Sequence, residues 1–512
     1  MLYKNIESLQ NAVKKGEVSL REVVSSYVKE IDQKNDDVNA FIKVYPEEAL
    51  KQAEEVEKKI KDGSAGALAG AIMGIKDLIC EKDKQATCAS HILENFESVY
   101  DATVIEKLKK DDAILLGRVN MDEFAMGSSN ENSIYGPTRN PHDTSKVPGG
   151  SSGGSAAAVG AGFCNTTLGS DTGGSIRQPA SFCGVVGIKP TYGRVSRYGL
   201  IAFASSLDCI GPLATNTQDA ALLLKSIAGK DERDGTTADV PVPDYTKTVQ
   251  NPESNITIGM PEIYFSEGLD PEISDRIQDV VKSLEKEGAK VVPVDLSHNK
   301  YAIATYYILA TAEASSNLAR YDGIRYGHRA DIKKVKDDLH KEEEAINQRL
   351  KAASNGERGA IEQELKEMDT PLIRLYKQSR TEGFGTEVKR RVMLGTYVLS
   401  SGYYDAYYGK AQKIRRLIKE DFDRAFKDVD VIVSPTSPTT AFDIGSKIDD
   451  PLQMYLNDIY TISANLAGIC GINVPVGKHS NGLPIGLQFM ANTFQEERLL
   501  NAARLVERQF ES

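Results

Sequence analysis

Short apolar runs bounded by turn residues alternate with helical patterns along most of this 512-residue chain. Runs of the first kind lie at residues 66–79, 112–117 and 184–190, and they return at 428–438 and 471–477. Apolar runs of this length are typical of buried strands, and the patterns between them are typical of helices that cover a sheet. The alternation therefore predicts an α/β fold with α/β/α layers around one large mixed β-sheet.

The first 62 residues differ from the rest and are interpreted as an N-terminal helical segment packed on the core. Ser19 and Glu22 form a candidate capping box, and Gly63 follows a charged helical pattern as a stop signal. We therefore predict a division into this segment, residues 1–62, and a single large domain over residues 63–512.

Residues 333–369 stand apart because almost all of them are charged or favour a helix. Their few apolar side chains lie near helical spacing on both sides of the turn sequence SNGERG at 354–359. We expect a helical hairpin that projects from the surface as an insertion within the large domain. A solvent-exposed insertion without a function of its own is favoured over a partner-binding arm, since charged helical faces usually contact only solvent.

Charge and composition exclude several classes of function. A net charge of −11 makes the chain a poor partner for nucleic acid on its own, because phosphate binding needs clustered Lys and Arg. The six cysteines form no CxxC pair and only six histidines are present, so we expect reduced thiols and no metal site. The N-terminus has no apolar signal core, and no run is long enough to span a membrane. These features predict a cytoplasmic protein without membrane contact.

Residues 147–162, VPGGSSGGSAAAVGAG, concentrate glycine and serine where a helix is expected to begin. A phosphate-binding P-loop is excluded because the lysine of that pattern is missing. Residues 149–153 match the G-x-S-x-G elbow of α/β-hydrolases, but no strand is expected before them and the downstream histidines lie in polar or charged stretches. We therefore interpret the elbow match as chance.

A second cluster, residues 168–190, places Ser175 directly after two glycines. Successive glycine amides can form an oxyanion-binding concavity, which is where an acyl-transfer nucleophile is needed. Lys76 lies in an apolar run, and burial lowers the pKa of a lysine toward the range of a general base. From the residues alone, a lysine that only snorkels from the edge of a strand is an equal alternative.

Together these stretches resemble the amidase signature family, whose members combine a Gly/Ser-rich segment, a sequence like GSDTGGSIRQPA and a lysine on an upstream strand. The resemblance implies a Ser–cis-Ser–Lys triad in which Lys76 is the base, Ser151 relays the proton and Ser175 is the nucleophile. It implies a cis peptide bond before Ser151 and a large twisted sheet as the fold. The oxyanion hole that it implies consists of the backbone amides of Thr172, Gly173, Gly174 and Ser175.

Longer segments, among them residues 120–143, 189–208 and 451–477, resemble the glutamine-hydrolysing members of this family that serve in tRNA-dependent amidotransferases. The resemblance implies that the chain releases ammonia from glutamine for a partner subunit that converts Glu-tRNA(Gln) to Gln-tRNA(Gln). It implies B and C subunits in a heterotrimer, with the tRNA held mainly by the partner. No cofactor is implied in this chain, since the partner subunit uses the ATP and Mg of the overall reaction.

The same resemblance implies a glutamine pocket. Free glutamine carries a carboxylate and an ammonium, so its pocket needs both a cation and an anion, and arginine offers two parallel donors to a carboxylate. The matching segments place Arg391 at the carboxylate, with Arg390 as the alternative, and Asp458 at the ammonium. A hydroxyl of Tyr307 or Tyr306 is expected to add a contact. A stand-alone amidase acting on another carboxamide is the alternative function, and it has no need for this pair of charges.

Overall fold

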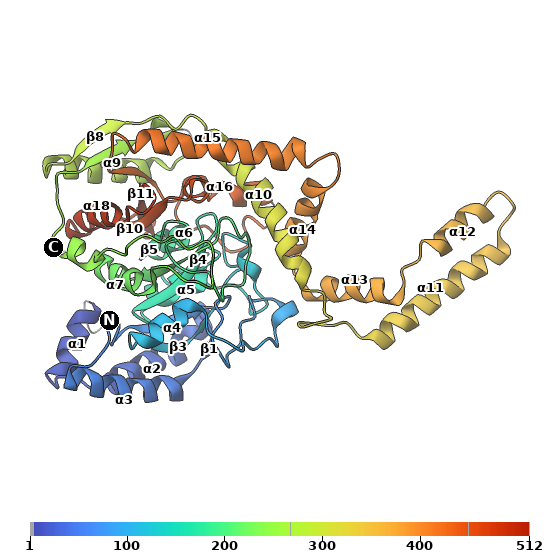
Figure 1. Ribbon diagram of the computed structural model, residues 1–512, viewed down its shortest axis with the longest axis horizontal. Coiled ribbons are helices and arrows are strands. Elements are labelled where there is room, and N and C mark those ends of the chain that lie inside the picture. The colour runs from blue at the N-terminus through green and yellow to red at the C-terminus, as the bar shows by residue number, and fades with distance from the viewer. Residues whose placement is uncertain (1–4, 267, 449, 511–512) are drawn as a thin grey trace.

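The computed structural model describes residues 5–266, 268–448 and 450–510, and its strands form one sheet (Figure 1). The strands in chain order are β1 (Phe41–Val44), β2 (Ile72–Lys76), β3 (Ile114–Val119), β4 (Thr166–Asp171), β5 (Val186–Lys189), β6 (Cys209–Ala214), β7 (Thr257–Met260), β8 (Lys290–Pro293), β9 (Val431–Pro435), β10 (Cys470–Lys478) and β11 (Pro484–Ala491).

The sheet has eleven strands in the order β1-β3-β2-β4-β6-β5-β10-β11-β9-β7-β8. β2 runs parallel to β3 and β4, and β7 runs parallel to β8 and β9. The remaining neighbours pair antiparallel. The prediction of one large mixed sheet is therefore confirmed.

Helices cover the sheet on both sides and extend beyond it at one end (Figure 1). They are α1 (Ile6–Lys14), α2 (Leu20–Val38), α3 (Pro46–Asp62), α4 (Thr103–Lys110), α5 (Gly153–Gly160), α6 (Arg177–Cys183), α7 (Thr217–Ile227), α8 (Tyr245–Gln250), α9 (Pro271–Lys286), α10 (Ala302–Asn317), α11 (Ile332–Ala352), α12 (Arg358–Lys366), α13 (Pro371–Gly383), α14 (Thr386–Leu399), α15 (Lys410–Ala425), α16 (Pro451–Leu456), α17 (Ile462–Ala467) and α18 (Glu496–Arg508).

The N-terminal segment contains a strand as well as helices. α3 ends at Gly63, whose φ of +80° is the left-handed conformation of a helix stop. Between α2 and α3 the chain forms β1, which pairs antiparallel with β3 at the edge of the sheet. The interpretation of residues 1–62 as helical throughout is therefore wrong at Phe41–Val44, because a strand of four residues is too short for its alternation to stand out.

α11 and α12 form an arm that extends away from the rest of the molecule, and α13 leads the chain back (Figure 1). Val335, Leu339 and Ile346 are the buried residues of α11, whereas α12 has none. The helices lie on either side of residues 353–357, and they expose most of their charged side chains. The arm thus contributes little to the apolar core, which lies around the sheet.

Two general expectations can be compared with the structure. All six cysteines are buried and none is in a disulfide, as expected for reduced thiols. Among the helices of the described ranges, none is both long and apolar enough to cross a bilayer.

Candidate active site

Lys76 is the last residue of β2, a strand in which every residue is buried. Its Nζ donates to the hydroxyls of Ser151 and Ser152 at 2.8 Å each and of Ser170 at 2.9 Å. Because the side chain is fully buried, desolvation lowers its pKa to about 7, although nearby carboxylates favour the charged form. An amine with this pKa is partly neutral near pH 7 and can accept a proton from a serine hydroxyl.

The loop before α5 brings Ser151 to Lys76, and it requires glycine to do so. The peptide bond between Gly150 and Ser151 is cis, as the family resemblance implies. A Cβ at Gly150 would lie 2.1 Å from Oδ2 of Asp122, and the Gly150 N–H donates to Gln178 Oε1 at 3.0 Å. The close approach of this loop to Asp122 and Gln178 therefore accounts for part of the glycine content of residues 147–162.

Ser152 and Ser170 complete the surroundings of the amine, and the sequence patterns assigned no role to Ser170. The Ser152 hydroxyl donates to the carbonyl oxygen of Ser170 at 3.0 Å, while it also accepts from Lys76. Ser170 lies on β4, five residues before Ser175 and next to β2 in the sheet. In the sequence, the only sign of Ser170 is its place as the first serine of GSDTGGS. Its contact with Lys76 could not be predicted, because that contact depends on the pairing of β2 with β4.

Ser175 lies just before α6, and 9% of its surface is exposed. The Ser175 carbonyl accepts a hydrogen bond from the Ser152 N–H at 3.1 Å, which holds the two serine-containing loops together. Within the described residues, however, the Ser175 hydroxyl makes no hydrogen bond to the Ser151 hydroxyl. The structure thus brings the three predicted triad residues into one region and forms the Lys76–Ser151 contact, but it does not close the Ser151–Ser175 contact.

The turn before Ser175 presents fewer free amides than the resemblance implies. The Gly174 N–H donates to Asp171 Oδ1 at 2.8 Å, so the structure corrects its implied role as an oxyanion donor. The Gly173 carbonyl accepts from Thr461 Oγ1 at 2.7 Å. Within the described residues, the N–H groups of Thr172, Gly173 and Ser175 donate to no other group. These three amides are therefore the ones available to an oxyanion.

Thr172, the remaining residue of the implied oxyanion hole, has a buried side chain that faces another carboxylate. Its hydroxyl donates to Asp208 Oδ1 at 2.7 Å. Burial raises the pKa of Asp208 to about 6, against the effect of this hydrogen bond. The Thr172 side chain therefore anchors the start of the turn.

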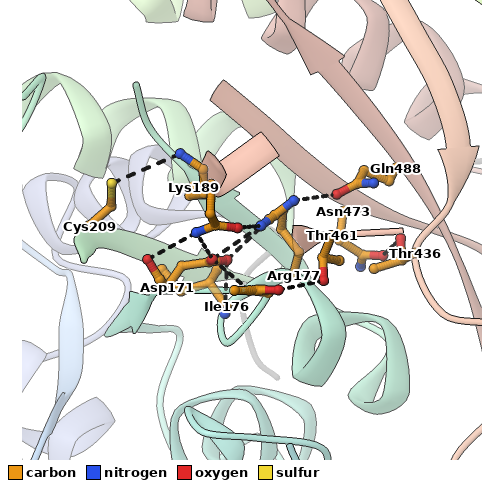
Figure 2. Close-up of polar contacts among 12 residues, drawn as sticks. Asp171, Ile176, Arg177, Lys189, Cys209, Thr436, Thr461, Asn473 and Gln488 are labelled. Carbon is orange, nitrogen blue, oxygen red and sulfur yellow. Dashed lines mark hydrogen bonds and ion pairs between the residues drawn. The ribbon is translucent and has the colours of Figure 1, made fainter. Parts of the chain in front are cut away.

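A buried ion pair supports the turn that carries Ser175 (Figure 2). Arg177 and Asp171 are both fully buried, and two N–O distances of 3.1 Å join them. The guanidinium also donates to Gln488 Oε1 at 2.6 Å and to Asn465 Oδ1 at 2.7 Å. Burial alone would raise the pKa of Asp171, but Arg177 outweighs this and holds the pKa at about 2. The carboxylate is therefore ionised, and it accepts hydrogen bonds from backbone N–H groups of the turn.

Arg391 lies on α14, and only 3% of its surface is exposed. Its Nε donates to Glu387 Oε1 at 2.8 Å, and its guanidinium carbon lies 5.5 Å from the ring centre of Tyr307 and 5.6 Å from that of Tyr455. Arg390 also pairs with Glu387, but its side chain is 38% exposed. Both arginines line one cavity, so the structure keeps both as candidates, and Arg391 is the one held among aromatic rings.

Asp458 is buried on the turn between α16 and α17. Burial raises its pKa to about 7, against a hydrogen bond from Ser128 and the positive charge of Arg391. No ion pair joins Asp458 to Arg391 in the described part of the chain, although the positive charge of Arg391 favours the ionised form of Asp458. Arg391 and Asp458 are therefore near enough to interact electrostatically but do not pair with each other.

Tyr306 and Tyr307 lie near both of these residues. Tyr307 stacks on Tyr455 with ring centres 3.8 Å apart, and its buried hydroxyl has no hydrogen-bond partner in the described structure. Tyr306 borders the nucleophile turn, since a Cβ at Gly173 would lie 2.7 Å from the Tyr306 hydroxyl oxygen. The Tyr307 hydroxyl is thus free to bind a substrate, and the Tyr306 ring limits the space above the turn.

The arrangement combines a partly neutral amine, a serine at an amide-lined turn and, nearby, a buried arginine and a buried carboxylate. It can perform acyl transfer from an amide to a serine hydroxyl. Within the described residues, no group of three or more His, Cys, Asp or Glu side chains is placed to hold a metal ion.

The comparisons with known proteins agree with this chemistry. The sequence profile of the Amidase family matches residues 22–500. The A subunit of the glutamyl-tRNA(Gln) amidotransferase from Salinibacter ruber is 53% identical over 98% of each chain. The crystal structure of the corresponding Thermotoga maritima protein has a TM-score of 0.73 at 40% identity and covers 96% of this chain and 91% of its own. The native peptide amidase of Stenotrophomonas maltophilia has a TM-score of 0.76 at 28% identity and covers 99% and 97%.

Proposed function

The chain belongs to the amidase signature family, and within that family we propose that it is the glutamine-hydrolysing subunit of a glutamyl-tRNA(Gln) amidotransferase. Identity of 53% over 98% of both chains to a protein of that name supports this proposal. It is an amidase whose reaction breaks a carbon–nitrogen bond in glutamine. The activity of the complete amidotransferase then forms a new amide on the tRNA-bound glutamate.

In the proposed mechanism, the neutral amine of Lys76 accepts a proton from Ser151 while Ser151 accepts one from Ser175. The Ser175 oxygen attacks the side-chain amide carbon of glutamine, and the N–H groups of Thr172, Gly173 and Ser175 stabilise the oxyanion. The triad returns the proton to the leaving nitrogen, which departs as ammonia. Water then hydrolyses the glutamyl ester on Ser175 and releases glutamate. The Ser151–Ser175 hydrogen bond forms when substrate is bound, since catalytic hydrogen bonds often tighten only in that complex.

Substrate recognition in this proposal uses the two ends of the charged pocket. Arg391 binds the α-carboxylate of glutamine and Asp458 binds its α-ammonium, while the Tyr307 hydroxyl adds a hydrogen bond. Asp458 is ionised in this complex because the ammonium replaces part of the solvation that it lost on burial. A stand-alone amidase for neutral amides has no need for a buried arginine and a buried carboxylate to bind its substrate, so these two residues favour glutamine.

The amide acceptor belongs to other subunits in this proposal. A chain with a net charge of −11 is unsuited to hold tRNA alone, so the B subunit of a heterotrimer with a small C subunit holds most of the Glu-tRNA(Gln). The B subunit uses ATP and Mg to activate the glutamate, and this chain supplies ammonia. The assembly works in the cytoplasm, where aminoacyl-tRNA is used.

The observation that carries the proposal is the fully buried Lys76 amine held by three serine hydroxyls. We expect Ser175→Ala to abolish glutamine-dependent ammonia release while the complex with B and C subunits still assembles. Ser379→Ala is the matched control, because Ser379 is a buried serine that binds the Ala330 N–H at the base of the arm. Ammonia release by Ser175→Ala at the rate of the control would disprove the assignment of the nucleophile.

A further inference from the structure

We propose that Thr461 is a positioning residue, which aligns the oxyanion-binding turn and connects it to the ammonium-binding end of the pocket. The inference rests on the proposed function, because it assigns Asp458 and the turn at Ser175 to one reaction. Thr461 itself touches no reacting atom and acts through the backbone of Gly173.

The contacts of the Thr461 hydroxyl are the first observation. The side chain is fully buried, and Oγ1 lies 2.7 Å from the Gly173 carbonyl oxygen and 3.1 Å from the Asp458 carbonyl oxygen. A Cβ at Gly174 would lie 2.1 Å from this same Oγ1, so the turn is packed directly against it (Figure 2). The hydroxyl therefore bridges two backbone segments that are almost 300 residues apart in the sequence.

The peptide unit between Gly173 and Gly174 is held from both sides. The Thr461 hydroxyl donates to the carbonyl of this unit, which belongs to Gly173. The N–H of this unit, which belongs to Gly174, donates to Asp171. Gly174 has a φ of +140°, which only glycine adopts readily, and two successive glycines have little backbone preference of their own. Contacts from outside the turn must therefore set the orientation of this peptide.

That orientation sets the relative alignment of two of the available oxyanion donors. The clamped peptide unit lies directly between the N–H of Gly173 and the N–H of Ser175 in the chain. A rotation of the unit changes ψ of Gly173 and φ of Gly174, and so turns the two amides away from a common point. Without the Thr461 hydroxyl, Asp171 holds only the N–H side of the unit. The predicted consequence is a misaligned oxyanion hole with an intact nucleophile.

Thr461 also belongs to the turn that carries Asp458. The N–H groups of Thr461 and Ile462 both donate to the Asp458 carbonyl, at 3.0 and 3.1 Å. The Asp458 side chain approaches the nucleophile turn as well, since Oδ1 would lie 3.4 Å from a Cβ at Gly174. Binding of an ammonium at Asp458 and alignment of the oxyanion hole therefore depend on one short segment.

The test is the kinetics of glutamine hydrolysis by Thr461→Val in the complete complex. Valine keeps the shape of threonine and removes the hydroxyl, while both backbone donors to Asp458 remain. We expect kcat to fall by about 10-fold to 10²-fold, less than the loss of an oxyanion donor itself, with KM for glutamine unchanged. Thr461→Ser, which restores the hydroxyl, is expected to recover most of kcat.

Thr436→Val is the matched control. Thr436 is also fully buried, and its hydroxyl donates to Asn473 Oδ1 at 2.7 Å and not to the backbone of the nucleophile turn (Figure 2). We expect this variant to keep the kcat of the wild type. A wild-type kcat in Thr461→Val, an equal loss in Thr436→Val, or no recovery in Thr461→Ser would each overturn the inference. If Thr461→Val does not fold, we expect the same fall in kcat, with KM unchanged, for Thr461→Ala. A wild-type complex without glutaminase activity would instead overturn the proposed function.

Discussion

Two arginine–carboxylate pairs of similar geometry lie in contrasting parts of this molecule. Arg177 meets Asp171 through two contacts of 3.1 Å beneath the nucleophile turn, and Arg349 meets Glu364 through two contacts of 2.9 Å across the arm. The first pair is fully buried, whereas the side chains of the second are 57% and 46% exposed. Distance alone does not distinguish the pairs, so their surroundings must decide what each contributes.

The surroundings act through desolvation. Neither member of the buried pair can exchange its partner for water, so each charge depends on the other and on Asn465 and Gln488. The exposed pair competes with water and salt, and holding two long side chains together costs conformational entropy. A buried pair can thus hold the backbone of a catalytic turn in place, which an exposed pair cannot do.

The largest expected effect comes from Lys76, the buried amine of the site. Lys76→Met keeps an unbranched side chain in the same space but removes the base, so we expect glutamine hydrolysis to fall by about 10²-fold to 10⁴-fold. Lys107→Met is the control, because Lys107 is a partly buried lysine that donates to the carbonyls of Ile227 and Ala228 outside the site. Ammonia release should be measured for both variants in the complete complex, and equal losses would contradict the special role of Lys76.

The pH dependence of the wild type checks the same assignment without a mutation. Burial lowers the pKa of Lys76 to about 7, and the base must be neutral to act. We therefore expect kcat/KM to be constant well above pH 7 and to fall by about tenfold per pH unit below it. Asp458, with a pKa raised to about 7, loses its charge in the same direction and steepens the fall. A profile that rises toward acid would exclude a neutral lysine as the base.

The sequence allowed the mixed sheet and the segments that meet at the candidate site to be predicted because both depend on local signals. Apolar runs mark buried strands, and Lys76, Ser151 and Ser175 lie in segments whose residue types resemble those of a known family. β1 was missed because four residues do not establish an alternation.

The partners of the nucleophile turn could not be predicted for a different reason. Asn465 and Gln488 contact Arg177 across about 300 residues of chain, and such contacts follow from the folded topology alone. The orientation of the Gly174 N–H was equally hidden, because the side chain of Asp171 sets it. The glycines of a turn can be read from a sequence, but the groups that orient their amides cannot.

The next largest effect is expected from the buried pair itself. Arg177→Met leaves Asp171 as an uncompensated buried charge, so we expect a loss of about 3–5 kcal/mol in the free energy of unfolding. Urea unfolding of the purified chain measures this free energy of unfolding. The double variant Asp171→Asn with Arg177→Met removes both charges and should recover part of the loss. A single variant as stable as the wild type would show that the pair is not needed to balance the buried charge.

The smallest effect is expected from the exposed pair, and it completes the comparison. Arg349→Met removes a contact of the same chemistry from the arm, but water can solvate Glu364 once the arginine is gone. We expect no resolvable change in the urea midpoint and no change in ammonia release, because the arm contributes little to the apolar core. High salt should also leave the urea midpoint of the wild type unchanged. Of the two pairs, screening weakens only the exposed one, which contributes little to stability. If Arg349→Met destabilised the chain as much as Arg177→Met, then exposure would not be the property that separates the two pairs, and the arm would have to be coupled to the core through α13.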